Sequence, residues 1–106
     1  GTNDADMVLA GNTVRKNKGG LAFALNGQVV GELPLPVAGL MSTESAESVE
    51  EKLQALKAAL KAHGISEDID AFMTLACVSL PVIPTLRLNT YGIVDVDAQQ
   101  IVPAVF

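Results

Sequence analysis

The chain has few of the residues that build enzyme active sites and disulfide frameworks. Its 106 residues include one cysteine, one histidine, one tyrosine and no tryptophan. A single cysteine cannot form a disulfide within the chain, which fits a reducing compartment, so we expect a cytoplasmic protein. Metal centres that activate water usually take several histidines, or histidine with carboxylates, at fixed spacing. With His63 alone, we predict that these residues bind no metal and no other cofactor.

Basic charge is also scarce. Seven Lys and Arg residues face twelve Asp and Glu residues, which gives a net charge of −5. Nucleic acids and anionic membrane surfaces both attract basic faces, so we predict neither as a partner. The uncharged stretch 71–86 is too short to span a membrane and is interrupted by Pro81 and Pro84.

What the sequence does have is aliphatic residues. Hydrophobic residues make up 49% of the chain, although aromatic residues make up only 4%. One interpretation is a compact aliphatic core in a single domain of residues 1–106. The other is apolar surface that something outside this chain covers. The uncharged stretch 71–86 favours the second interpretation, because it gathers the surplus in one place.

Residues 4–17 are predicted to form the first helix. Thr2, Asn3 and Asp4 are all suitable N-cap residues, and Gly19-Gly20 ends the helix. Apolar residues recur at helical spacing and should form one buried face. These residues are Met7, Ala10, Gly11 and Val14.

Asn26-Gly27 predicts a tight β-hairpin between the apolar arms 21–25 and 28–33. This dipeptide is typical of type I′ turns, in which both residues have positive φ. The first arm is apolar on both faces, so we predict a central strand. Gly19-Gly20 does not predict a phosphate loop, because such a loop follows a strand and precedes a helix.

Residues 44–63 are predicted to form the second and strongest helix. Ser42, Thr43 and Ser45 are candidate N-caps. Gly64 ends the helix, with His63 at the C-terminal end, where a cation suits the helix dipole. The residues expected to be buried are Val49, Leu53, Leu56 and Leu60.

The remainder of the chain gives weaker signals. Residues 72–80 fit either a short helix capped by Asp70 or a buried strand. Residues 93–97 alternate as in a half-exposed strand, and 101–106 could form an edge strand. The whole predicts an α+β fold, in which a small mixed β-sheet with a central hairpin packs against helices.

The residues by themselves predict no active site. Cys77 lies in an apolar run whose neighbours Ala76 and Val78 should be buried, unlike the surroundings of nucleophilic cysteines. Asp95 and Asp97 should lie on the same side of one strand, as a catalytic carboxylate pair would. Ordinary alternation of a surface strand explains them equally well.

Seven short blocks of the sequence follow one another in a distinctive order. They are Gly1–Met7, Gly19-Gly20 with Asn26-Gly27, Leu33–Ser42, Phe72–Leu75, Leu80–Pro84, Leu86-x-Leu88 and Gly92–Asp95. Together they resemble the C-terminal domain of adenine deaminases, whose first block reads Gly-x-Asn-Asp-x-Asp-Met. The resemblance covers nearly the whole chain. One departure is Asp70-Ala71, where the family often has Asn-Pro.

The resemblance implies chemistry that takes place outside these residues. Such enzymes carry an N-terminal amidohydrolase barrel with a dinuclear manganese or iron centre, where metal-bound hydroxide converts adenine to hypoxanthine and ammonia. None of the ligands lies in this chain. We therefore expect residues 1–106 to be a C-terminal domain, without catalysis of its own, that packs on or closes the barrel of the same polypeptide.

The family-specific residues outside any regular amphipathic face are candidates to face the barrel or the substrate. They are Asn3, Asp4, Gly39, Leu40, Met41 and Ser42. Loops on a rigid scaffold often carry binding residues, which supports this hypothesis. The alternative is that Leu40 and Met41 fill the core while Asp4 only caps a helix.

Two other functions stay open. A stand-alone module that binds small molecules would need a pocket lined by polar residues, and a structural interaction domain would need an exposed apolar face. A homo-oligomer is also possible. The lack of an initial Met and the stretch 71–86 favour a piece of a larger enzyme.

Overall fold

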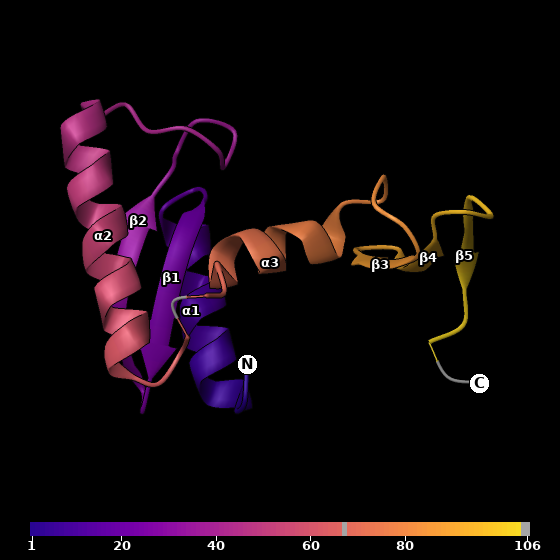
Figure 1. Ribbon diagram of the computed structural model, residues 1–106, viewed down its shortest axis with the longest axis horizontal. Coiled ribbons are helices and arrows are strands. Elements are labelled where there is room, and N and C mark those ends of the chain that lie inside the picture. Colours follow the sequence, from indigo (N-terminus) through magenta and orange to yellow (C-terminus); the bar gives the residue numbers. More distant parts are fainter. Residues whose placement is uncertain (67, 105–106) are drawn as a thin grey trace. The chain divides into compact units, whose positions relative to one another are not determined.

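The computed structural model describes residues 1–66 and 68–104. The chain divides into two compact units, the first of residues 1–66 and the second from residue 67 onward, and we describe each by itself. The elements, in chain order, are α1 (Asp4–Lys16), β1 (Gly20–Leu25), β2 (Gln28–Pro34), α2 (Ala46–Ala62), α3 (Ala71–Ser79), β3 (Leu86–Asn89), β4 (Gly92–Asp95) and β5 (Gln100–Val102) (Figure 1).

The hairpin of β1 and β2 is the centre of the first unit. The strands are antiparallel, with Leu21 opposite Leu33 and Phe23 opposite Gly31. Asn26 and Gly27 join them with φ values of 52° and 75°. These values confirm the predicted turn with positive φ at both residues.

β1 is an edge strand, and the prediction of a central strand is wrong. Within residues 1–66 the sheet contains β1 and β2 alone. β1 is nevertheless apolar on both faces, because a helix lies on each face of the hairpin. Two successive residues of β2 identify these helices. Gly31 lies against Leu56 of α2, whereas the Glu32 carboxylate accepts a hydrogen bond of 2.7 Å from Asn17, the C-cap of α1. Because neighbouring residues of a strand point to opposite faces, α1 and α2 cover the two faces of the hairpin.

The core of the first unit lies between the hairpin and α2. Of the three predicted N-cap candidates, Ser45 caps α2, because its hydroxyl oxygen accepts a hydrogen bond from the Ser48 N–H. Leu56 is 1% exposed and packs in this layer with the buried Leu33 and Leu60. Val49 and Leu53, which we also expected to be buried, are half-buried.

The face that α1 presents to the hairpin matches the prediction only in part. Ala10 and Val14 are half-buried, but Met7 and Gly11 are exposed, and the buried residue of this helix is Asp6. At 100° per residue, a helix that turns Asp6 inward also turns Ala10 inward and rotates Met7 away. The apolar pattern therefore misplaced the face of α1 by one residue.

The second unit contains α3 and a three-stranded meander. Residues 71–79 form the helix that the sequence left undecided, and the Asp70 carboxylate caps it by accepting a hydrogen bond from the Met73 N–H. Antiparallel pairing joins β3 to β4 and β4 to β5, so β5 is an edge strand. It ends at Val102 and so covers only the start of the predicted strand 101–106, whose last two residues lie outside the described residues. β4 ends at Asp95, two residues before the predicted end.

The second unit lacks a buried core within its described residues. Of residues 68–104, none is buried. Ala76 and Val78 are exposed, contrary to the prediction, because three strands of only three or four residues offer little surface to cover a helix.

The α+β class and the hairpin packed against helices are confirmed. The strands of the described residues differ from the prediction in forming two antiparallel sheets instead of one mixed sheet. Among the same residues, no helix has the length and apolar character required to cross a membrane.

Candidate functional site

A buried carboxylate at the start of α1 joins the helix to the hairpin turn. One oxygen of Asp6 accepts a hydrogen bond of 2.7 Å from the Gly27 N–H. The other oxygen accepts bonds from the Asn26 N–H at 2.9 Å and from the Asn3 side-chain amide at 2.7 Å. A type I′ turn leaves backbone N–H groups at its tip without partners in the ladder, and Asp6 supplies the acceptors that they need.

These bonds keep Asp6 ionised. The Gly27 N–H lowers the pKa of the Asp6 carboxyl most, and the Asn3 amide and the Asn26 N–H lower it further, against the opposing effect of burial. A carboxylate with a lowered pKa and its oxygens occupied is a poor general base at neutral pH. Asp6 therefore stabilises structure and does not carry chemistry.

Asn3, the first predicted site residue, belongs to the same cluster. Its side-chain oxygen accepts a hydrogen bond of 2.8 Å from the Asp6 N–H, while its amide donates to the Asp6 carboxylate. Asn3 is thus the N-cap of α1 and a partner of Asp6. Asp4 is exposed in the first turn of α1, and within the described residues its carboxylate forms no hydrogen bond.

The predicted segment Gly39–Ser42 belongs to a tight loop that follows β2. Val37 and Met41 bond to each other through both N–H and C=O groups, at 3.1 Å each. Gly39 has a φ of 75° inside this loop. Leu40 and Met41 are 77% and 59% exposed, so the alternative that they fill the core is wrong. The Ser42 hydroxyl oxygen accepts a hydrogen bond from the Glu44 N–H.

The structure does not bring the two predicted segments together. Asn3 lies at the hairpin turn through its bond to Asp6. Gly39 lies at the other end, because a Cβ on Gly19, just before β1, would be 2.4 Å from the Gly39 Cα. In Figure 1 the start of α1 and the loop after β2 are at opposite ends of the hairpin. At about 3.3 Å per residue, β1 separates them by roughly 20 Å, so one small ligand cannot touch both.

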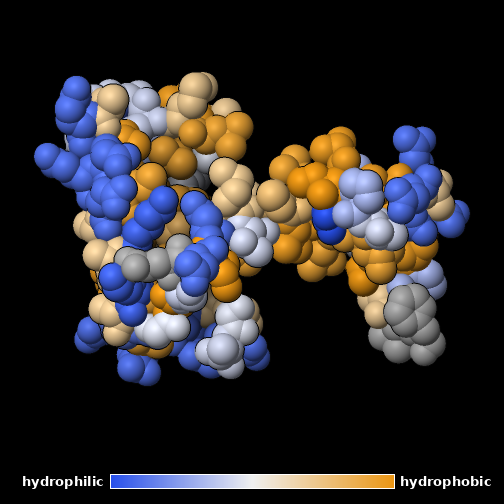
Figure 2. All heavy atoms as spheres, viewed as in Figure 1, coloured by the Kyte–Doolittle hydropathy of each residue, from blue (hydrophilic) through white to orange (hydrophobic). Residues whose placement is uncertain are grey.

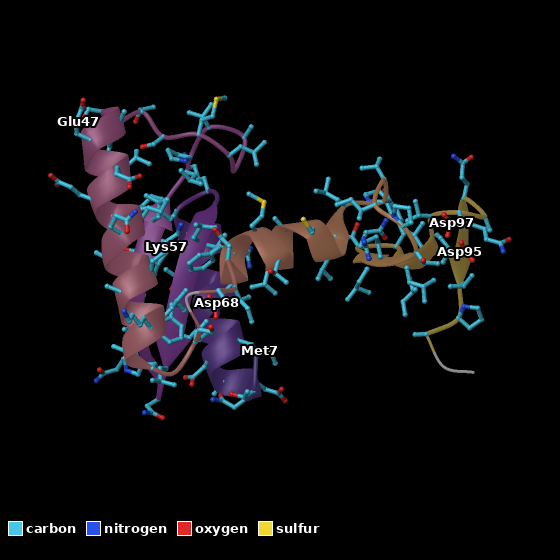
Figure 3. All side chains as sticks on the ribbon, viewed as in Figure 1. Met7, Glu47, Lys57, Asp68, Asp95 and Asp97 are labelled. Atoms are coloured by element: carbon cyan, nitrogen blue, oxygen red, sulfur yellow. The ribbon has the colours of Figure 1, made fainter. Side chains whose placement is uncertain are left out.

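The other chemical candidates are explained by local structure. His63 is the C-cap of α2, and its ring packs edge-on against Phe23 at 5.6 Å between ring centroids. Asp97 lies beyond the end of β4, so Asp95 and Asp97 do not belong to one strand. Figure 3 labels both side chains. The Asp95 carboxylate accepts a hydrogen bond from the Ala98 N–H in the following turn.

Sequence reasoning missed the role of Asp6. The sequence indicated only a favourable charge in the first helical turn, and twenty residues separate Asp6 from Asn26. The available signal was the Asn-Gly turn itself, because its tip amides require an acceptor. Nothing in local periodicity identifies which carboxylate provides it.

Asp6→Asn in the 106-residue chain is expected to loosen the hairpin turn. The variant loses the charge and points an amide donor at backbone donors, so we expect a melting temperature lower by about 5 °C or more. Amide exchange at Asn26 and Gly27 should accelerate. Asp4→Asn, on the same helical turn but exposed, is the matched control and should behave like the parent chain.

The same bonds predict the pH dependence of the turn. The pKa of Asp6 in the folded chain lies below its ordinary value of 3.8. The stabilisation that the ionised Asp6 gives to the turn is therefore fully present when the pH is above 3.8. It is lost as the pH falls through the folded pKa. NMR titration of the Asp6 carboxyl carbon should give a midpoint below 3.8. A midpoint above 3.8, or an Asp4→Asn variant as unstable as Asp6→Asn, would contradict this account.

Comparison with known proteins identifies relatives along almost the whole chain. Residues 1–100 match the adenine deaminase C-terminal domain family. The chain is similar to adenine deaminase 2 of Carboxydothermus hydrogenoformans (46% identity, 97% of this chain and 18% of the relative). It is also similar to the adenine deaminases of Kosmotoga olearia (55% identity, 91% of this chain and 16% of the relative) and of Shigella sonnei (47% identity, 92% of this chain and 16% of the relative). The chain thus spans less than a fifth of the length of these curated relatives.

Proposed function

The chain belongs to the adenine deaminase C-terminal domain family, and on this premise we propose that it serves as the C-terminal domain of a metal-dependent adenine deaminase. In that reaction water replaces the C6 amino group of adenine, which gives hypoxanthine and ammonia. The match of residues 1–100 to the family is the observation that carries the proposal. Adenine catabolism or purine salvage in the cytoplasm is the corresponding role, in keeping with a single free cysteine.

The catalytic centre of the proposed enzyme belongs to another part of the polypeptide. Among the described residues, no three His, Cys, Asp or Glu side chains gather as metal ligands. A dinuclear manganese or iron centre therefore does not fit residues 1–66 and 68–104. We assign that centre to an N-terminal amidohydrolase barrel of the same polypeptide.

The domain would act by packing on this barrel or closing it. Leu40 and Met41 support the proposal, because a tight loop holds both side chains exposed at one end of a rigid hairpin. Gly39–Ser42 therefore stays a candidate to face the barrel. Asn3 is a weaker candidate than the sequence indicated, since both ends of its side-chain amide are engaged with Asp6. Asp4 is exposed and keeps its carboxylate available.

A structural interaction domain is the second candidate function. The exposed apolar residues favour it over a small-molecule binding module, because a binding module would bury such residues in its own pocket. The two candidates differ in whether adenine turnover depends on the longer polypeptide. A homo-oligomer is compatible with either.

The 106-residue chain alone is expected to produce no hypoxanthine from adenine. Its described residues contain no group of side chains that could hold the catalytic metals. The measurement incubates the purified chain with adenine and excess manganese or iron, and follows hypoxanthine and ammonia. The full-length gene product, loaded with the same metals, should turn adenine over under the same conditions.

Two controls make this comparison decisive. A preparation from the same host without the chain's gene measures contaminating deaminase. Guanine and cytosine, offered to the full-length product, test whether the amino group of adenine is the preferred one. Adenine turnover by the 106-residue chain above that of the host control would contradict the assignment of the metal centre to the N-terminal barrel. A full-length product that leaves adenine unchanged would sink the proposed reaction.

A further inference from the structure

Helix α3 is apolar on nearly all sides, because its two polar side chains, Thr74 and Ser79, donate their hydroxyl groups to backbone carbonyls at Asp70 and Ala76. Its nine residues include no charged side chain. Met73 and Leu75, which are 62% and 65% exposed, point to nearly opposite sides of the helix because they are two residues apart. The chain continues with the exposed Leu80 and Val82. Figure 2 shows hydrophobic atoms gathered over α3 and the connection that follows it. A helix that is apolar all round is normally buried.

The unit that carries α3 cannot provide this cover from a core of its own. None of residues 68–104 is buried. Domains below about 40 residues usually need disulfides, metals or a partner to be stable. Cys77 is free, and no metal-ligand group exists among the described residues. Apolar cover from outside this unit remains as the source of stability.

The partner must offer a large apolar surface and be present whenever the protein folds. A second copy of the chain offers too little, because two helices of about 13.5 Å stacked together bury less than the roughly 1,200 Å² of small specific interfaces. The rest of a longer polypeptide meets both conditions. The matched relatives carry more than four-fifths of their length outside the segment that this chain matches. A covalent connection also gives that region a high effective concentration.

We propose that α3 and the following residues, together the α3 surface (Ala71–Val82), dock against an apolar surface of the longer polypeptide outside residues 1–106. This inference rests on the proposed function and identifies the surface through which the domain attaches. It differs from the Gly39–Ser42 hypothesis, because α3 belongs to the other unit. The α3 surface would be the principal anchor, since a charge-free helix has no stable alternative in water.

Hydrogen exchange followed by mass spectrometry tests the proposal in the full-length protein. We expect the backbone amides of α3 to exchange at least about tenfold more slowly there than in the 106-residue chain, because a docked helix opens less often. The amides of the hairpin, which has its own cover from α1 and α2, should exchange at similar rates in both.

Two glutamate substitutions provide the matched comparison. Leu75→Glu places a charge on α3, and Val8→Glu places the same charge on α1 at a site that is 61% exposed. In the full-length protein, Leu75→Glu should return α3 exchange to the rate of the 106-residue chain, because an interface rejects an unpaired charge. Val8→Glu should leave it slow.

Each alternative occupant gives a different result. Equal α3 protection in the chain and the full-length protein would mean that residues 1–106 cover α3 themselves, and protection that rises with chain concentration would identify a second copy. Either result overturns the proposal, as does slow α3 exchange in full-length Leu75→Glu. Adenine turnover by the full-length parent protein is measured separately. If that protein leaves adenine unchanged, the proposed reaction is wrong, and the exchange rates of α3 still test whether α3 is docked.

Discussion

Gly20→Ala is expected to prevent residues 1–66 from folding stably. Gly20 has a φ of 127°, a conformation that residues with a side chain rarely adopt. A Cβ at this position would lie 2.1 Å from the Leu33 carbonyl oxygen and 2.9 Å from the Leu35 nitrogen. Both contacts are with backbone, so relief would separate Gly20 from Pro34, its partner in the ladder. Strain and clash together should cost about 3 kcal/mol or more.

Thermal unfolding followed by circular dichroism measures this effect, with Gly11→Ala as the matched control. Gly11 lies on the exposed side of α1, and no atom beyond its chain neighbours and the nearby backbone of its own helix is within 4 Å of the position that its Cβ would take. Alanine is the better helix former there and should raise stability by roughly 0.5–1 kcal/mol. If Gly20→Ala melted at the temperature of the parent chain, the described backbone conformation and contacts of Gly20 would be wrong.

The hairpin turn and α2 were predictable because their signals are local. Asn26-Gly27 determines its own φ values, which are 52° and 75° as a type I′ turn requires. In α2, the cap at Ser45 and the spacing of Leu56 and Leu60 lie within a single element. Nearby residues set the backbone conformation of the turn and the cap of the helix, so both could be predicted locally. The acceptor that further stabilises the turn, Asp6, lies outside that local sequence.

The face of α1 and the place of β1 depend on contacts between distant residues. Asp6 turns inward because the hairpin turn, twenty residues later, offers two N–H donors. β1 is apolar on both faces because a helix covers each face, and a flanking strand would produce the same pattern. Periodicity identifies which residues share a face but does not identify what covers it.

Prediction of the candidate site from the sequence was limited by the same dependence on contacts between distant residues. Family resemblance selected Asn3 and Gly39 together, although a complete strand separates them. Residues with a shared ancestry need not share a site, since Asn3 serves a helix cap and Gly39 a close backbone contact with Gly19. The uncharged stretch 71–86, by contrast, correctly indicated apolar surface without a cover of its own.

Leu56→Ala should produce the second large loss of stability, and Gly31→Ala should reduce that loss. Leu56 is 1% exposed, so its truncation is expected to cost about 2–5 kcal/mol of unfolding free energy. Gly31→Ala alone should cost roughly 1–3 kcal/mol, because the new Cβ would be 2.7 Å from the Leu56 Cδ1. In the double variant the clash is absent and the added methyl fills part of the space. We expect the two losses to fall short of additivity by about 1–2 kcal/mol.

Urea unfolding of the parent chain, both single variants and the double variant at one temperature gives this coupling energy. Leu60→Ala provides the matched comparison, since Leu60 is also buried on α2, while the three nearest non-neighbouring atoms to the position of a Gly31 Cβ belong to Leu56. Gly31→Ala and Leu60→Ala should therefore add to within about 0.5 kcal/mol. Additive losses for Gly31→Ala with Leu56→Ala would mean that α2 does not pack on β2 at Gly31. The register between helix and hairpin would then have to be reassigned, because Leu56 is the residue that sets it.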